Sequence, residues 1–310
     1  MIEILLSVYN GEKHLEEQLE SLLSQDYKDT VITVRNDCST DGTVDILNRY
    51  IDKYPQKIRM ITTPSNGHST VFSYGELMKN ANASSGTYYA ICGQGDVWKP
   101  TKLTSEFTAL KALEAQTSPR TPILVHCDAE ICDSGMGRVS TSLADHANLR
   151  TDKFTLKQAL AENPVIDETC LMNQALLNLC KNISGNAVSI GWWIALNAAA
   201  FGKVGYCRDA LVRKRFSGTS EIEACAGKDA FLAKHTDLLK EHTFETKKSY
   251  YQAQEFVQAN ENGLTDANRA IASGYAAFIS ANKFVKMSKI LFGGYRKKGF
   301  FKVLGQLSNC

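Results

Sequence analysis

The sequence predicts an α/β fold in which a mainly parallel, Rossmann-like sheet is covered by helices on both faces. Short apolar, β-rich runs alternate with segments whose leucines recur at helical spacing, and this alternation is typical of parallel sheets. The 310 residues are enough for one large domain with an appendage. The apolar content of 44% and the charged content of 22% are those of an ordinary soluble protein.

The order of the expected elements defines two parts of the chain. Strands are expected at residues 2–8, 31–34 and 57–61, in the run ending at Cys92, and at residues 123–126. Helices are expected at residues 12–24, 44–51, 71–82, 156–162, 174–180 and 192–201. From Glu221 onward the pattern is polar and helical. This organisation predicts a sheet domain over residues 1–215 and a helical, basic C-terminal extension over residues 216–310.

Charge is distributed unevenly, although the formal net charge of +2 gives no reason to expect a nucleic-acid partner. After Asp266 no acid occurs, whereas lysines and arginines continue among aromatic residues. A basic, aromatic stretch suits an anionic membrane surface, so residues 283–310 are expected to make peripheral membrane contact. The alternative is a helical appendage whose apolar face packs on the sheet domain.

Nine cysteines are scattered without a Cys-x-x-Cys pair, which predicts reduced, mostly buried thiols. No basic-then-apolar leader is visible, and the most apolar interior run, Trp192–Phe201, is too short to span a bilayer. We therefore expect a cytoplasmic location.

Three strand exits carry the residues that suggest chemistry. The run ending at Cys92 leads into Gly93-Gln94-Gly95-Asp96, whose only charge is Asp96. Ligands in open α/β sheets bind outside the carboxyl ends of the strands, where this acid is expected. The first two strand exits offer Ser7, Tyr9 and Asp37. A pyrimidine base can stack on the ring and donate its imide N–H to the acid. The alternative is a surface tyrosine and a turn aspartate.

These motifs resemble family 2 glycosyltransferases of the GT-A fold. In that family a Ser-x-Tyr-Asn-Gly exit and a strand ending in Asp-Asp-Gly-Ser bind the donor nucleoside, so Ser7, Tyr9 and Asp37 match base-binding positions. Asn36 replaces the first acid of that pair and Cys38 replaces the glycine.

Within the family, further segments are similar to the rhamnosyltransferases of streptococcal-type cell-wall and capsular polysaccharide assembly. The similar segments are Asn66-Gly67, Lys79-Asn80-Ala81, Val97–Leu103, Cys127-Asp128, Trp192–Leu196, Phe201-Gly202-Lys203 and Phe292–Lys297.

The resemblance implies transfer of a sugar with inversion, most plausibly rhamnose from dTDP-rhamnose. The implied partners are a dTDP- or UDP-linked donor and a glycan or lipid-linked glycan acceptor. The donor diphosphate leaves with two negative charges, which Mg²⁺ or Mn²⁺ would offset. A general base would take the proton of the acceptor hydroxyl.

Two motifs depart from the family at reacting positions. The family strand runs into Asp-Gln-Asp-Asp-Val-Trp, whereas here Gly93 and Gly95 replace the acids at its first and third positions. Asp96 is left as the residue expected to bind the metal and the donor diphosphate, which predicts a weakened metal site. The family base is an Asp directly before a double aromatic, and here that residue is Gly191, which cannot transfer a proton.

The double aromatic itself, Trp192 and Trp193, is expected at the acceptor, with one ring packed inward and the other bordering the acceptor sugar. The alternative is that both rings belong to the core.

Two other segments of the subgroup have changed. A loop of small residues appears with Asp167 and Glu168. These acids are either a solvated pair, which is the favoured interpretation, or a compensation in which one of them replaces the missing base. In the Tyr-Arg-Gln-His-Gly segment, Arg215 is retained as a contact to the diphosphate and Ser217 replaces the histidine.

Two functions therefore remain open from the sequence. One is an active glycosyltransferase of polysaccharide biosynthesis. The other is a catalytically impaired relative that binds a nucleotide-sugar or glycan, or supports a partner enzyme.

Overall fold

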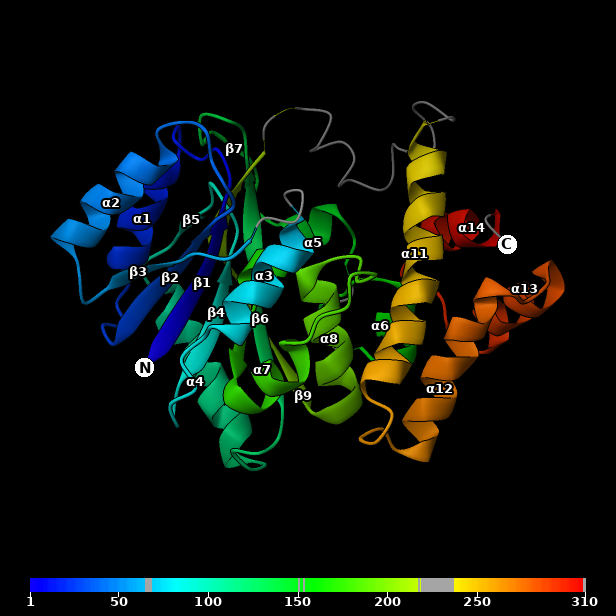
Figure 1. Cartoon of the computed structure of the whole chain (residues 1–310). Helices are drawn as coiled ribbons and strands as arrows, with labels where there is room; N and C mark the ends of the chain where they lie inside the picture. Colours follow the sequence, from blue (N-terminus) through cyan, green and yellow to red (C-terminus); the bar gives the residue numbers. More distant parts are fainter. Residues whose placement is uncertain (65–68, 150, 153, 217, 219–236, 309–310) are drawn as a thin grey trace.

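The computed structural model describes residues 1–64, 69–149, 151–152, 154–216, 218 and 237–308 (Figure 1). Asn66-Gly67 and Ser217, which the sequence singled out, lie outside the described residues.

The described strands form one curled sheet in which parallel pairing covers most of the strand length. The strands are β1 (Ile2–Val8), β2 (Thr30–Asn36), β3 (Ile58–Ile61), β4 (Tyr88–Cys92), β5 (Val97–Trp98), β6 (Ile123–Cys132), β7 (Arg138–Ser140), β8 (Leu171–Asn173) and β9 (Lys203–Arg215). Their order is β3-β2-β1-β4-β8-β6-β9-β5, with β7 beside β6. β1, β2, β3 and β4 run parallel, as do β6 and β9, whereas β8 is antiparallel to both of its neighbours.

Helices follow most strands, as the sequence alternation predicts. They are α1 (Leu15–Leu23), α2 (Thr43–Lys53), α3 (Thr70–Lys79), α4 (Lys102–Ala115), α5 (Leu143–His146), α6 (Leu156–Ala161), α7 (Gln174–Cys180) and α8 (Ile190–Phe201). A short 3₁₀ turn, η1 (Asp167–Thr169), precedes β8.

Successive residues of the central strands enter two hydrophobic cores on opposite faces of the sheet. Leu5 packs in the core that contains residues of α3, α7 and α8. Its neighbours Ile4 and Leu6 pack in the core that contains residues of α1, α2 and α4. This two-residue period is that of a strand buried on both faces, and it confirms the predicted covered sheet.

The largest difference from the sequence expectation is β9, which was not predicted although it is 13 residues long. Its sequence alternates charged and apolar residues irregularly, and only Leu211 and Val212 are fully enclosed. A strand without a clean period therefore has little sequence signal. It matters here because its last two residues, Lys214 and Arg215, reach the edge of the sheet where β4 ends.

The C-terminal part is helical in the described residues, with α11 (Asp237–Ala259), α12 (Asp266–Ala276), η2 (Ala277–Ile279), α13 (Lys283–Phe292) and α14 (Phe300–Ser308). These helices, yellow to red in Figure 1, lie beyond α6 and α8. Phe256 of α11 meets Trp193 of α8 edge to face, with ring centroids 6.1 Å apart. The helices thus share a core with the sheet, and the division at residues 215 and 216 stays a prediction.

Among the described residues the cysteines are free thiols and most are buried. In the same part of the chain, no helix combines the length and the apolar character needed to cross a bilayer.

Candidate active site

Two glutamines hold the exits of β1 and β4 together. Gln94 accepts the Tyr9 backbone N–H at 2.7 Å and donates to the Tyr9 carbonyl at 3.0 Å. The buried Gln18 of α1 donates to the Gly93 carbonyl and accepts the Gly95 N–H at 3.1 Å. Gly95 has a φ of 80°, where a side chain would be strained. The glycine loop is therefore fixed at the sheet edge where α/β proteins bind ligands.

A cavity of about 230 Å³ lies at this edge. It is lined by Ser7, Tyr9, Asp37, Thr70, Ser73, Tyr74, Gly93, Gln94, Asp167, Glu168 and Ile190. The three expected nucleotide-binding residues are thus brought together with both new acids. Typical ligand pockets measure roughly 300–1,000 Å³, so this cavity encloses only part of a nucleotide sugar.

On the side of the cavity formed by Ser7, Tyr9 and Asp37, called the nucleotide side here, Asp37 is an ion-paired carboxylate. Its side chain lies 2.9 Å from the fully buried guanidinium of Arg35. Arg35 also donates to Ser73 at 2.8 Å and to Thr63 at 2.7 Å. These bonds satisfy a charge that would be costly to bury alone. Tyr9 is 38% exposed, so its ring is accessible to a base.

The glycine position that Cys38 replaces retains a glycine-like backbone. Cys38 has a φ of 60°, in the left-handed region that residues with a side chain adopt only at a cost. The loop after β2 therefore keeps its shape despite the substitution.

Asp167 fills the space that a side chain at residue 191 would need. A Cβ placed on Gly191, in the first turn of α8, would stand 2.4 Å from Asp167 Oδ1 and 2.6 Å from Asp167 Cα. The same Oδ1 accepts hydrogen bonds from Asn163 Nδ2 at 2.9 Å and from Ser189 Oγ at 3.1 Å. The carboxylate is thereby oriented at the N-terminus of a helix, where negative charge is favoured.

Glu168 has the same relation to Gly93. A Cβ on Gly93 would stand 2.3 Å from Glu168 Cγ. The Glu168 side chain is 23% exposed and its Oε1 lies 2.7 Å from Lys214 Nζ. The two acids are therefore not a solvated loop pair, which the sequence favoured. Two of the three glycines that stand at expected acid positions, Gly93 and Gly191, each face one of these acids, whereas Gly95 faces Arg215. We call the side of the cavity formed by Gly93, Asp167, Glu168 and Gly191 the reacting side.

Lys214 lies between acids of different loops. Its Nζ is 2.7 Å from Glu168 Oε1 and 4.0 Å from Asp96 Oδ2. Asp96 is 1% exposed, and its Oδ1 accepts the Arg215 backbone N–H at 3.3 Å. Within the described part of the chain, Asp96 Oδ2 is buried without a hydrogen-bond partner.

Burial and this ammonium set the protonation of the three acids. Burial raises the pKa of Asp96 to about 7, against the attraction of Lys214. Burial, followed by the charge of Glu168, raises the pKa of Asp167 to about 6. Burial also opposes ionisation of Glu168, but the attraction of Lys214 outweighs it and lowers the pKa of Glu168. Asp167 is thus mostly ionised at neutral pH and has a pKa suited to accepting a proton.

The described residues do not fit a resident Mg²⁺ or Mn²⁺. These cations usually take one or two protein carboxylates together with phosphate and water oxygens. No cluster of three or more His, Cys, Asp or Glu side chains suited to a metal occurs in the described ranges. The buried Asp96 Oδ2 faces the ammonium of Lys214. A cation at Asp96 would therefore meet a like charge.

Arg215 is bonded to protein acceptors, and its expected contact with the diphosphate stays a prediction. Its side chain is 7% exposed, and Nη2 lies 2.5 Å from Glu17 Oε2. Nε donates to the Gly95 carbonyl at 3.1 Å and Nη1 to the Ser134 carbonyl at 2.6 Å. Through these bonds the guanidinium links the glycine loop, at Gly95, to Glu17 of α1.

Trp192 and Trp193 are both buried, at 6% and 0% exposure, and neither lines the cavity. Trp192 donates its Nε1–H to the Ala159 carbonyl, and Trp193 packs on Phe256. Inward packing was expected of one of the two rings, and in the structure both rings pack inward. A role of Trp192 at the acceptor stays a prediction, whereas the full burial of Trp193 leaves it no surface for a sugar.

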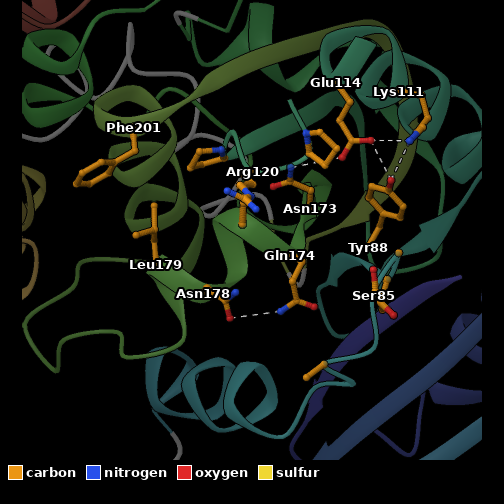
Figure 2. Close-up of a pocket in the computed structure, with 16 residues that line it drawn as sticks. Ser85, Tyr88, Lys111, Glu114, Arg120, Asn173, Gln174, Asn178, Leu179 and Phe201 are labelled. Carbon is orange, nitrogen blue, oxygen red and sulfur yellow. Dashed lines mark hydrogen bonds and ion pairs between the residues drawn. The ribbon is translucent and has the colours of Figure 1, made fainter. Parts of the chain in front are cut away.

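A larger cavity of about 810 Å³ lies at the opposite edge of the sheet, beside the start of β4 (Figure 2). Several of its polar side chains bond to one another. Tyr88 Oη donates to Glu114 at 3.0 Å, Lys111 lies 2.6 Å from the same carboxylate, and Gln174 donates to Asn178 at 3.3 Å. Because this cavity is remote from the strand exits, we assign it no part of the site.

Sequence reasoning missed three residues that shape the site. Gln18 and Arg35 act through buried hydrogen bonds to residues distant in the chain, and a single sequence carries no signal for such partners. Lys214 stands at the tyrosine position of the Tyr-Arg-Gln-His-Gly segment, directly before Arg215. The presence of a cation at that position was the signal that could have identified it.

Comparison with known proteins agrees with this fold. Residues 3–118 match the model of Glycosyl transferase family 2. A dTDP-rhamnosyl transferase, RfbG of Shigella flexneri, is 28% identical over 105 residues, which are 34% of this chain and 36% of RfbG. The putative teichuronic acid biosynthesis glycosyltransferase TuaG of Bacillus subtilis is 28% identical over 34% of this chain and 40% of its own length. The first two curated relatives are matched over 30% and 37% of their length.

Solved structures show the same fold. Residues 1–349 of S. aureus TarS in complex with UDP-GlcNAc align with a TM-score of 0.53 at 13% identity, covering 99% of this chain and 90% of TarS. The mannosyltransferase PcManGT from Pyrobaculum calidifontis, solved with GDP-Man and Mn²⁺, aligns with a TM-score of 0.58 at 15% identity, covering 92% of this chain and 71% of the enzyme. The fold is thus that of the GT-A glycosyltransferases, with a C-terminal helical region.

Proposed function

We propose that this chain is a glycosyltransferase of polysaccharide biosynthesis that transfers a sugar from a nucleoside diphosphate to a glycan acceptor with inversion. The observation that supports this proposal most strongly is that two acids stand beside glycines at expected acid positions. Asp167 fills the space at Gly191, and Glu168 fills the space at Gly93. Undirected loss of a site gives no reason for two new acids to fill both spaces around one cavity.

The proposed donor is a dTDP- or UDP-linked sugar, with rhamnose as the specific candidate. The likeness to RfbG over 105 residues supports rhamnose, since RfbG is named a dTDP-rhamnosyl transferase. The half-exposed Tyr9 ring offers a stacking face for the base, and Asp37 with Arg35 offers polar contacts beside it.

Asp167 is proposed as the general base. Asn163 and Ser189 orient its carboxylate, and burial holds its pKa near the working range of such a group. In the transfer, the acceptor oxygen attacks C1 of the sugar as its proton passes to Asp167, and the bond from C1 to the diphosphate oxygen breaks with its electron pair on the diphosphate.

A donor-consumption assay with dTDP-rhamnose and with UDP-sugars tests the proposal, with Asp167→Asn as the decisive variant. Loss of a general base lowers turnover by about 10²–10⁴-fold. The matched control is Asp29→Asn, since the Asp29 side chain is 71% exposed and remote from the cavity. Undiminished turnover in a folded Asp167→Asn protein would remove Asp167 from the mechanism.

The second candidate is a non-catalytic relative that binds a nucleotide-sugar or supports a partner enzyme. It is favoured by Arg215, whose guanidinium is engaged by Glu17 and two carbonyls. Titration calorimetry with dTDP and UDP separates the two candidates when combined with the assay. Binding without donor consumption under any condition would establish the second.

Peripheral membrane contact through residues 283–310 is also proposed. Phe284 and Phe292 of α13 are 83% and 86% exposed, and lysines lie between them in the sequence. A basic helix with exposed aromatics suits an anionic lipid surface. The variant Phe284→Ser/Phe292→Ser should lose co-sedimentation with vesicles of anionic lipid. Equal co-sedimentation of variant and wild type would contradict the proposal.

A further inference from the structure

Glu168 lines the reacting side of the cavity and pairs with the ammonium of Lys214, which is not itself among the lining residues. Lys214 is the penultimate residue of β9, where its backbone pairs with Ile131 of β6. The side chain of Lys214 is 21% exposed, and that of its partner Glu168 is 23% exposed. The ion pair therefore stands at the boundary between the protein interior and the cavity that Glu168 lines.

The neighbouring cation differs in this respect. Arg215 directs Nε, Nη1 and Nη2 to Gly95, Ser134 and Glu17. The 2.7 Å contact with Glu168 uses one N–H of Lys214, and an ammonium has three. The distance of 4.0 Å to Asp96 Oδ2 is too long for a hydrogen bond. Lys214 can thus hold Glu168 and still donate to a phosphate oxygen.

Among the residues that the structure describes, a divalent cation has no equivalent place. Gly93 and Gly95 supply no ligand side chain, and the buried Oδ2 of Asp96 lies beside the ammonium of Lys214. An ion bound to Asp96 would be repelled by a positive charge a few ångströms away. Positive charge is still required, because a departing diphosphate needs its negative charge offset.

We propose that Lys214 is the built-in cation of this site, which binds the diphosphate of the donor directly and takes the place of a resident Mg²⁺ or Mn²⁺. The inference rests on the proposed function, since it assigns the diphosphate contact of that reaction. When the bond from C1 breaks, its electron pair stays on the diphosphate oxygen, and the ammonium of Lys214 stabilises the resulting charge. Glu168 positions Lys214, in the space that Gly93 leaves free.

Calorimetric titration of the full chain with dTDP and with UDP, in EDTA and again with Mn²⁺, tests the inference. We expect binding in EDTA and no gain in affinity on adding Mn²⁺. Lys214→Met should weaken binding in EDTA about tenfold or more, because a charge-assisted hydrogen bond is lost. Lys214→Arg should retain most of the affinity. Lys203→Met, an exposed lysine of the same strand, is the matched control and should bind as wild type does.

The outcomes separate the inference from the function on which it rests. Binding that requires Mn²⁺, or equal binding by Lys214→Met, overturns the inference and leaves the proposed function standing. Absence of binding in both conditions overturns both. If Lys214→Met does not fold because Glu168 is left unpaired, Lys214→Met/Glu168→Gln removes both charges and is subject to the same criteria.

Discussion

On the nucleotide side of the cavity the three expected residues lie together, whereas on the reacting side glycines stand where acids were expected and two acids of another element lie beside them. Ser7 is the penultimate residue of β1, Tyr9 follows β1 and Asp37 follows β2, and all three line the cavity. Across the cavity, Gly93 and Gly191 have no side chain, and Asp167 and Glu168 of η1 fill the two spaces. A site can thus retain the location of its charges while changing the residues that carry them.

The largest expected effect tests the rigidity of the nucleotide side. Asp37→Asn removes the charge that balances the fully buried Arg35, and breaking a buried ion pair costs about 3–5 kcal/mol of unfolding free energy. Chemical denaturation measures the loss. Asp29→Asn, at a carboxylate that is 71% exposed, should lower the midpoint little. Equal midpoints would mean that the nucleotide side does not depend on this pair.

The next effect tests the exchange on the reacting side. Gly191→Asp forces a Cβ to within 2.4 Å of Asp167 Oδ1. Such overpacking costs about 1–3 kcal/mol. Gly191→Asp/Asp167→Gly should recover much of that loss, because the two sites share one space. Gly185→Asp is the control, since no atom lies within 4 Å of a Cβ there. If the losses of stability of Gly191→Asp and Asp167→Gly simply add in the double variant, the two residues do not share one space.

A smaller effect follows from the titration of Asp167. Burial, and then the charge of Glu168, raises its pKa to about 6, and the base must be ionised to accept a proton. Turnover should therefore fall about tenfold per pH unit below 6. Glu168→Gln should shift this acid limb to lower pH, since a neighbouring negative charge is removed. A profile that stays flat to pH 5 would argue against Asp167 as the base.

The same shift affects stability with a definite sign. The pKa of Asp167 is higher in the folded chain, about 6, than the ordinary value of 3.8. The folded state therefore binds the proton more tightly, so this contribution to stability is present at acidic pH and is lost as the pH rises through about 6. Asp167→Asn should remove this pH dependence in denaturation curves.

The smallest expected effect concerns Cys38, in the loop after β2 on the nucleotide side. Cys38 adopts a left-handed backbone, which costs a residue with a side chain about 1–2 kcal/mol. Glycine avoids this strain, but it loses more conformational entropy on folding, which offsets part of the gain. Cys38→Gly should therefore raise the unfolding free energy by about 0.5–1 kcal/mol, measured by denaturation. Cys38→Ala keeps the strain and should show no such gain. A loss of stability in Cys38→Gly would show that the cysteine is held by contacts instead.

The sequence allowed the sheet, its covering helices and the nucleotide side to be predicted, because apolar periodicity and strand-exit motifs are local signals. β9 escaped prediction because its charges interrupt its period. The role of Asp167 and Glu168 escaped as well, since only the packing of η1 against β4 and α8 brings them to Gly93 and Gly191. The bonds of Arg215 to Glu17 and to two carbonyls could not be predicted either, because these partners are distant in the chain.

Helix α8 joins the chemistry to the far end of the chain. Its N-cap, Ser189, orients Asp167, and its Trp193 bears on Phe256 of α11. The C-terminal helices consequently support, through α8, the position of the carboxylate that we propose as the base. Exchanging them for another tail should change the orientation of Asp167, although no hydrogen bond joins that carboxylate to a described residue of the tail.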